Sequence, residues 1–151
     1  MSDFSVATAD MDQYRLQLAG FNISNGAGAS GYADGEWFTA KQLATSFTAV
    51  EGTDGSIARS KTNRRLCEFS VNLLQTCASN AFLSGLLAMD EALPNGAGIG
   101  SLVLMDLSET TLIRCTRVWL VGPPEVSLDR GAKERKWVLQ GPKSVYLVGG
   151  N

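Results

Sequence analysis

Three pairs of neighbouring carboxylates are the side chains of this sequence whose type could support acid–base or metal chemistry. Paired carboxylates can exchange a proton with a reacting group or hold Mg²⁺ through their oxygens. Each pair falls in a loop or at the end of an expected helix or strand, where acidic side chains are commonly solvated. We therefore predict no catalytic site and no metal site at them. The pairs are Asp34 with Glu36, Asp90 with Glu91, and Asp106 with Glu109.

Histidine is absent from the 151-residue sequence, and cysteine occurs three times. The lack of histidine excludes Ser-His-Asp and Cys-His catalysis and every histidine-ligated metal site. Cys67, Cys77 and Cys115 are odd in number and have no CxxC spacing, which argues against a disulfide framework and a zinc site. They are predicted to be buried free thiols of a protein made in the cytoplasm. The sequence therefore predicts a protein that is not an enzyme and has no cofactor.

Two glycine-rich segments superficially match a phosphate-binding fingerprint. They are GAGASG at 26–31 and GAGIG at 96–100. Dinucleotide binding needs a strand before such a loop and a helix directly after it. The first segment leads into extended sequence, and the second lies between a helix and a strand. Both are therefore interpreted as connections.

A cluster of four basic residues follows a turn predicted at 51–55 and could contact phosphate groups. Few aromatic residues are interleaved with it, and Glu51 and Asp54 lie nearby. We interpret the cluster as a solvated loop or as a salt-bridging surface that faces another copy of the protein. It comprises Arg59, Lys61, Arg64 and Arg65.

The composition is that of one globular domain with a hydrophobic core, since 44% of the residues are hydrophobic and 19% are charged. The low charged fraction indicates that part of the surface is covered by partners. A net charge of −2 argues against general nucleic-acid binding. No apolar run reaches the roughly 20 residues of a membrane span, and no secretory signal begins the sequence, so we expect no membrane insertion.

Hydrophobic periodicity predicts a mainly β (α+β) fold, a β-sandwich or barrel with one packed α-helix at about 79–92. An extended arm is expected at 1–11. A projecting hairpin or loop is expected at 45–63, around the Asp54-Gly55 turn. The expected strands lie at 14–23, 36–50, 66–75, 101–107, 111–121, 136–140 and 144–148.

The strand at 66–75 alternates between apolar and polar residues, which indicates one face in the core and one face that is wet or pairs with something polar. Its apolar face carries Cys67, Phe69, Val71 and Leu73. Its polar face carries Glu68, Ser70 and Asn72.

The next two strands have less regular patterns. The segment 101–107 is apolar on both faces apart from Asp106, as expected of a central or interface strand. In 111–121 the apolar phase set by Cys115 shifts to Val118. A β-bulge near residue 116 would explain this shift.

The helix is expected to begin with Ser79 as its N-cap. Its main apolar stripe is predicted at Phe82, Leu86, Met89 and Leu93, widened by Leu83 and Leu87. Gly85 lies on the flank of this stripe, where the missing side chain would let the helix approach a sheet closely.

The pattern of residues 12–151 resembles the tail-tube proteins of long-tailed bacteriophages, particularly small tube proteins of contractile-tailed phages. The resemblance lies in the stretch from Thr62-Asn63 to Asn80-Ala81, in the helix ending at Asp90, and in the closing Trp137 and Gly149-Gly150-Asn151.

This resemblance implies a fold similar to the type VI secretion tube protein. It implies that six copies form a ring and that rings stack into a hollow tail tube through which genomic DNA passes. Sheath, baseplate and tail-terminator proteins would be the other partners. The protein would be assembled in the host cytoplasm and reside in the virion tail.

Within that picture, two surfaces are expected to carry function. The polar face formed by Glu68, Ser70 and Asn72 is expected to line the lumen, where a weakly acidic lining would let DNA slide. The basic cluster would grip DNA in the lumen, so we assign it to the contact between rings. The predicted inter-ring residues are Thr53, Asp54, Gly55, Arg59, Lys61, Arg64 and Arg65.

Two alternatives remain open from the sequence. The first is a small β-barrel that binds a ligand such as a flavin or lipid, which would require a closed apolar cavity. The second is a tube component of a type VI secretion system.

Overall fold

The computed structural model describes residues 14–19, 21–23, 37–96, 98–106, 111–131 and 133–149. The expected arm at 1–11, the glycine-rich segment 26–31 and the acids Asp34, Glu36 and Glu109 lie outside these residues. The described elements are β1 (Tyr14–Leu18), β2 (Phe21–Asn22), β3 (Phe38–Gln42), β4 (Phe47–Glu51), β5 (Ile57–Lys61), β6 (Leu66–Leu74), α1 (Ser79–Ala92), β7 (Gly100–Asp106), β8 (Leu112–Leu120), β9 (Glu134–Pro142) and β10 (Val145–Leu147).

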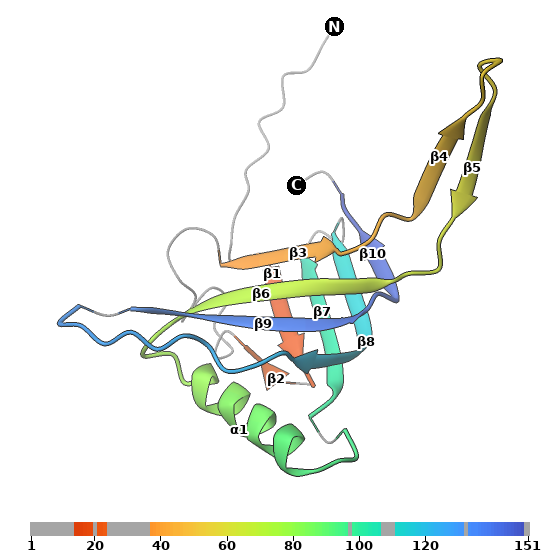
Figure 1. Ribbon diagram of the computed structural model, residues 1–151. Coiled ribbons are helices and arrows are strands. Elements are labelled where there is room, and N and C mark those ends of the chain that lie inside the picture. The colour runs from red at the N-terminus through yellow and green to blue at the C-terminus, as the bar shows by residue number, and fades with distance from the viewer. Residues whose placement is uncertain are drawn as a thin grey trace, which may run out of the picture.

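Eight of the strands form one antiparallel sheet that folds over on itself. Its order is β2-β1-β7-β8-β9-β6-β3, and β10 pairs with β8 beside this path. The strands β3, β6 and β9 form one layer, and β1, β7 and β8 cross behind it (Figure 1). The predicted β-sandwich with one helix is therefore confirmed.

The strand β8 joins the two layers through a bulge. Leu102 on β7 is opposite Cys115, but Gly100 is opposite Val118, so β8 carries one extra residue between the two pairs. The bulge predicted near residue 116 is thus confirmed. Beyond it, Trp119 and Leu120 pair with β9 in the other layer.

β9 approaches this bulge closely at Gly141. A Cβ atom at this position would lie 2.4 Å from the carbonyl oxygen of Arg117 and 3.1 Å from Cα of Val118. Only glycine fits such an approach between two backbones. β9 is longer than the strand predicted at 136–140, because Gly141 and Pro142 continue its pairing with β6.

The core lies between the two layers, and the alternation predicted for β6 is confirmed. Cys67, Phe69, Val71 and Leu73 are all buried there, at 2% exposure or less. The void among the core side chains measures about 10 Å³. A ligand site of the kind expected for a flavin or lipid carrier needs at least about 300 Å³. The interior of the described part is therefore filled by side chains, which disfavours the ligand-binding alternative.

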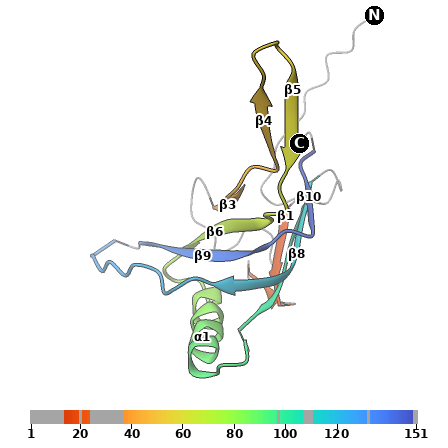
Figure 2. The same cartoon turned by 45° about the vertical axis from the view of Figure 1, so that its right-hand side comes forward.

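The helix α1 packs beneath the two layers (Figures 1 and 2), and its predicted apolar stripe is confirmed in part, because Phe82 and Leu86 pack against the core. Its buried apolar residues are Leu83 and Leu87, whereas Met89 and Leu93 of the predicted main stripe are 43% and 44% exposed. The expected role of Gly85 is also wrong, because it is exposed and an added Cβ would meet nothing within 4 Å. The docking of the helix on the sheet decides which side of it is buried.

The prediction that Ser79 is the N-cap of α1 is wrong. The capping position is Ala78, which makes no side-chain cap hydrogen bond, and Ser79 is the first helical residue. The Ser79 hydroxyl is fully buried and donates to the carbonyl oxygen of Ile23. The side chain thus ties the start of the helix to the segment after β2.

Candidate assembly surfaces

The hairpin formed by β4 and β5 projects from the folded body (Figures 1 and 2). Its two strands pair only with each other, and all ten of their residues are exposed. Phe47, Val50 and Ile57 are 47%, 67% and 72% exposed. Isolated two-stranded hairpins are marginally stable at best. No described part of the same copy therefore covers the apolar residues of the hairpin.

The two faces of the hairpin differ in charge. Directly opposed residues share a face, and the side chains alternate along each strand. From the register, one face holds Thr48, Val50, Ala58 and Ser60 and carries no charge. The other face holds Phe47, Ala49, Glu51, Ile57, Arg59 and Lys61. On that face the Arg59 guanidinium lies 4.4 Å from the centroid of the Phe47 ring.

The hairpin turn is held in place by its own side chains. The Ser56 hydroxyl and backbone N–H donate to Oδ1 of Asp54 at 2.6 and 3.0 Å. These hydrogen bonds, the hydroxyl first, lower the pKa of Asp54 below its usual value. Gly55 has a φ of 86°, which suits glycine. The hairpin tip is therefore a slim turn with an ionised carboxylate.

A cavity of about 340 Å³ lies at the base of the hairpin, and four basic residues line it. Tyr146 and Ser144 also line it, because β10 pairs with β8 next to the start of β6. Among the described residues, the ion pair found is that of Lys133 with Asp129, at 3.5 Å. The four basic residues of the cavity therefore form no ion pair with a described residue. We call this the basic pocket. Its cations are Lys61, Arg64, Arg65 and Lys143.

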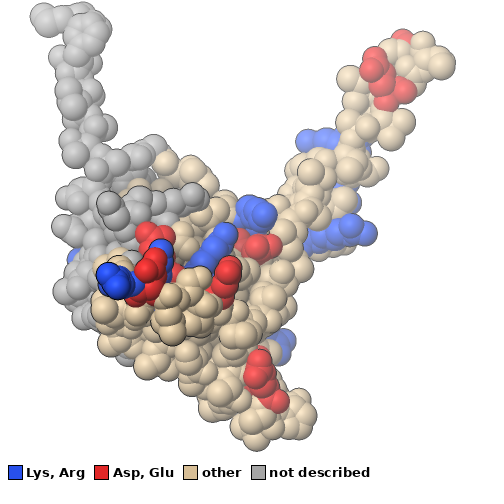
Figure 3. Space-filling model, turned by 60° about the vertical axis from the view of Figure 1, so that its left-hand side comes forward, with Lys and Arg blue, Asp and Glu red and all other residues tan. Residues whose placement is uncertain are grey.

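The basic pocket brings together part of the predicted cluster and adds to it. Lys61, Arg64 and Arg65 line it, whereas Arg59 lies on the hairpin against Phe47. Lys143 was missed by sequence reasoning because it is almost 80 residues from the others along the chain. In Figure 3 the acidic atoms of the hairpin gather at its far end, and the basic atoms lie nearer the body.

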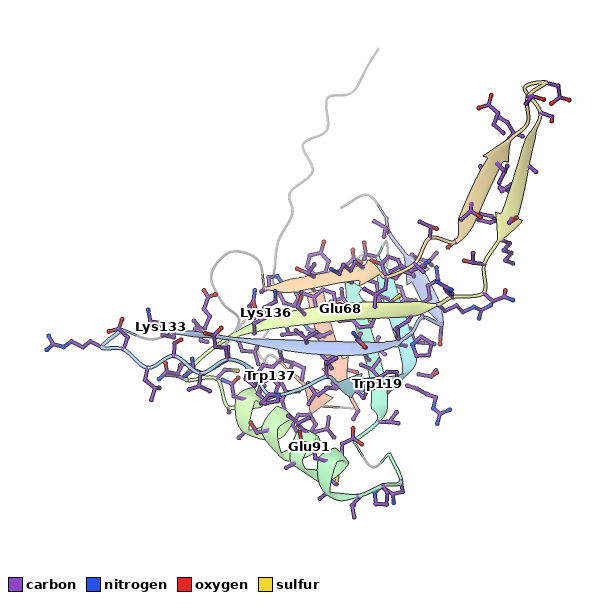
Figure 4. All side chains as sticks on the ribbon, viewed as in Figure 1. Glu68, Glu91, Trp119, Lys133, Lys136 and Trp137 are labelled. Atoms are coloured by element: carbon purple, nitrogen blue, oxygen red, sulfur yellow. The ribbon has the colours of Figure 1, made fainter. Side chains whose placement is uncertain are left out.

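The polar face of β6 belongs to a wider outer surface of the sheet. Glu68, Ser70 and Asn72 are half-buried on it. Glu68 is opposite Lys41 on β3, and Asn72 is opposite Lys136 on β9. Glu68 and Lys136 are labelled in Figure 4 on these neighbouring strands. Glu134 lies on the same face of β9 as Lys136, and both are exposed. This surface therefore carries two lysines, Lys41 and Lys136, and two glutamates, Glu68 and Glu134. The weakly acidic surface expected from β6 alone is thus charge-balanced by its neighbours.

The comparisons with known proteins agree with this architecture. Residues 15–145 match the family described as the Bacteriophage PhiTE tail tube protein. The chain belongs to this phage tail tube family. Its fold is also similar to that in the cryo-EM structure of the anti-feeding prophage cap, the AFP tube-terminating cap, with a TM-score of 0.56. The two chains are 9% identical over 93% of this chain and 92% of that chain. A comparison with curated proteins found no significant match.

Membership of the tail tube family makes this protein a structural component of a phage tail. Cys67, Cys77 and Cys115 are buried free thiols, as predicted. Burial raises the pKa of Cys115 to about 11 and, in the same direction, that of Cys67. Both thiols therefore stay protonated at neutral pH, and a protonated thiol is a poor nucleophile.

The structure of this tail tube protein describes three members of the predicted acid pairs, Asp90, Glu91 and Asp106. Asp106 is buried at the end of β7, while Asp90 is half-buried and Glu91 is exposed on α1. Where the structure is described, no three side chains of His, Cys, Asp or Glu gather as a metal site would require. No helix in that part of the chain has the length and apolarity needed to span a membrane.

A second groove, of about 420 Å³, separates α1 from the segment after β8. Trp137 and Glu91, both labelled in Figure 4, are among the residues that line it, together with Pro123. The indole Nε1–H of Trp137 donates to Oδ1 of Asn80 at 2.9 Å. This bond joins β9 to the first turn of α1 and fixes one wall of the groove.

Proposed function

We propose that this protein is the subunit of a hollow tail tube, in which six copies form a ring and the rings stack. Genomic DNA passes through the lumen, and the protein itself catalyses no reaction. The observation that carries this proposal is the hairpin β4–β5, whose residues are all exposed in one copy. In a stack of rings, neighbouring subunits cover it.

An open sheet edge supports ring formation. Asn72 N–H donates to the carbonyl oxygen of Trp37, and Leu43 N–H donates to that of Leu66. Because the pattern alternates, the backbone groups of Phe38, Ala40 and Gln42 point away from β6. Of these groups, the carbonyl oxygen of Ala40 accepts a hydrogen bond from the Tyr146 hydroxyl at 3.1 Å. The remaining groups of this edge have no hydrogen-bond partner among the described residues and can pair with a strand of the adjacent subunit.

The hairpin is assigned to the contact between rings. Its turn, with Thr53, Asp54 and Gly55, is the part farthest from the body along its two strands. The basic residues Arg59, Lys61, Arg64 and Arg65 belong to the same contact. An apolar hairpin ordered by a neighbour stabilises the polymer without adding to the core of the subunit.

The outer surface around Glu68, Ser70 and Asn72 is assigned to the lumen. Its two lysines and two glutamates balance, so DNA phosphates meet no excess of positive charge there. Each phosphate contact that is avoided lowers the affinity that would retard sliding DNA. Sheath, baseplate and tail-terminator proteins are the proposed partners outside the lumen and at the tube ends, and assembly is assigned to the host cytoplasm.

Electron microscopy of the purified protein tests the proposal directly. Rings or long tubes of uniform width are expected at high protein concentration or with tail components added. A strictly monomeric species under all these conditions would overturn the proposed function.

Removal of residues 48–60 tests the role of the hairpin. Phe47 and Lys61 are direct cross-strand partners, so an Asn-Gly link between them can close a short hairpin. We expect the shortened protein to keep its circular dichroism spectrum and to form no tubes. Loss of folding would show instead that the hairpin belongs to the core.

A further inference from the structure

We propose that the acidic tip of the hairpin seats in the basic pocket of a second copy of this chain. This inference rests on the proposed tube function and names the contact that stacks the rings. The partner is the turn of an identical hairpin, with Glu51 and Asp54 as the groups that are recognised.

The first support is that opposite charges are separated along one element. Glu51 and Asp54 lie at the tip, and Asp54 is fixed and ionised by its hydrogen bonds from Ser56. Lys61 lies at the other end of β5, opposite Phe47. Figure 3 shows this separation over the length of the hairpin.

The second support is that neither the acidic tip nor the basic pocket forms an ion pair with any described residue of its own chain. The ion pair found among the described residues joins Lys133 to Asp129 and includes no residue of the tip or the pocket. The tip cannot bend back to its own pocket, because Asp54 lies seven residues beyond Phe47, roughly 23 Å at the rise of a strand. A second copy can supply each half with its counter-charge.

The third support is the fit of the tip to the pocket. The turn is slim, with glycine at 52 and 55, and it presents carboxylate oxygens. The pocket holds about 340 Å³ and combines cations with hydroxyl and amide groups from Ser46, Thr62 and Asn63. Arginine binds carboxylate with two parallel hydrogen bonds, so Arg64 and Arg65 suit an acidic turn.

This contact has a geometric consequence. The tip and the pocket are different surfaces, so the contact is heterologous, and a heterologous contact that does not close into a ring generates an open stack. A DNA phosphate backbone is the competing ligand for the pocket. We favour the second copy because the acidic tip, which DNA would leave unpaired, is explained by the same contact.

Charge reversal in the full-length protein tests the inference. The tip variant carries Glu51→Lys with Asp54→Asn, since asparagine keeps the turn. The pocket variant carries Arg64→Glu, Arg65→Glu and Lys143→Glu, which leaves one cation and three carboxylates in the pocket. Each variant alone is expected to raise the protein concentration needed for tube formation about tenfold or more, because attraction becomes repulsion. Sedimentation and negative-stain microscopy measure this change.

Mixing the two variants provides the decisive measurement. The basic tip of the tip variant then meets the acidic pocket of the pocket variant. The unchanged acidic tip of the pocket variant likewise meets the unchanged basic pocket of the tip variant. The mixture is therefore expected to form tubes near the wild-type concentration. The control variant, Arg130→Glu with Lys133→Glu, reverses two exposed cations outside the pocket and is expected to assemble normally.

Tubes that form normally from both single variants would overturn this inference while leaving the tube function intact. Failure of the mixture to assemble, with each variant folded by circular dichroism, would overturn it as well. A pocket variant that assembles normally but loses binding to a DNA fragment would assign the pocket to nucleic acid instead. Absence of tubes from the wild-type protein would overturn the proposed function itself.

Discussion

The strand β6 and the hairpin β4–β5 are adjacent in the chain but differ completely in burial. On β6 every second residue from Cys67 to Leu73 is buried, with 2% exposure or less. On the hairpin no residue is buried, even though Phe47, Val50 and Ile57 are as apolar as the core. The difference separates two kinds of stability. The body is held by its own buried side chains, whereas the apolar residues of the hairpin are exposed in one copy and, under the proposed function, are covered by neighbouring subunits.

The largest change in the free energy of unfolding is expected when two phenylalanines, one in the body and one on the hairpin, are each replaced by alanine. Phe69 is fully buried and stacks on Phe38 with ring centroids 6.2 Å apart, so Phe69→Ala is expected to lower the free energy of unfolding by about 3–5 kcal/mol. Phe47→Ala is expected to change it by less than about 0.5 kcal/mol but to weaken tube formation. Urea unfolding and sedimentation measure the two effects.

An exposed apolar residue outside the hairpin serves as the control for Phe47. Leu128 is 78% exposed, and Leu128→Ala is expected to leave both unfolding and assembly unchanged. The separation between body and hairpin would be broken if Phe47→Ala destabilised the monomer as strongly as Phe69→Ala.

A smaller effect is expected at the bulge that joins the two layers of the body. Gly141→Ala places a methyl group 2.4 Å from the carbonyl oxygen of Arg117, and overpacking of this kind costs about 1–3 kcal/mol. The same change at Gly85 meets nothing within 4 Å, so Gly85→Ala is expected to stabilise α1 by up to about 1 kcal/mol. Thermal unfolding of both variants measures the contrast. Equal shifts would show that the close approach at Gly141 does not constrain the body.

The smallest effect is a decrease in the free energy of unfolding at alkaline pH, which arises from a buried thiol in the body. Burial, followed by the nearby Cys67, raises the pKa of Cys115 from 9.0 to about 11. The folded protein holds this proton more tightly than the unfolded chain. Its contribution is therefore complete below about pH 9 and is lost as the pH rises toward 11. Urea unfolding between pH 8 and 10.5 should show this decline, with a shallower decline for Cys115→Ala. Identical slopes for both proteins would contradict the assignment to Cys115.

The elements of the body could be predicted from the sequence where local patterns and the core agree. The alternation in β6 gave the correct buried face, and the change of phase between Cys115 and Val118 located the bulge. In both cases the side-chain period of a strand records burial directly.

The errors arose where a distant segment decides the outcome. Ser79 has the right type for an N-cap, but its hydroxyl bonds to Ile23, 56 residues away. The helix has apolar residues on more than one side, so its docking on the sheet selected Leu83 over Met89. Neither contact leaves a mark in the local sequence.

The assembly surfaces were predicted only in part for the same reason. Arg64 and Arg65 were found because they are adjacent to a polar segment in the chain. Lys143 and Tyr146 reach the same pocket through the pairing of β10 with β8, which periodicity does not reveal. Lys41 and Lys136, which balance the acids of the outer sheet surface, also lie on strands that are remote from β6 in sequence.

Under the proposed contact between tip and pocket, the separation of charge along the hairpin would give any finite stack of these subunits two unlike ends. One end of the stack would expose the acidic hairpin tips, and the other end would expose unoccupied basic pockets. Growth can then be directional, and a protein that stops elongation needs to match only one of the two charges. The charges of a few side chains on each subunit would thus determine the polarity of the whole tube.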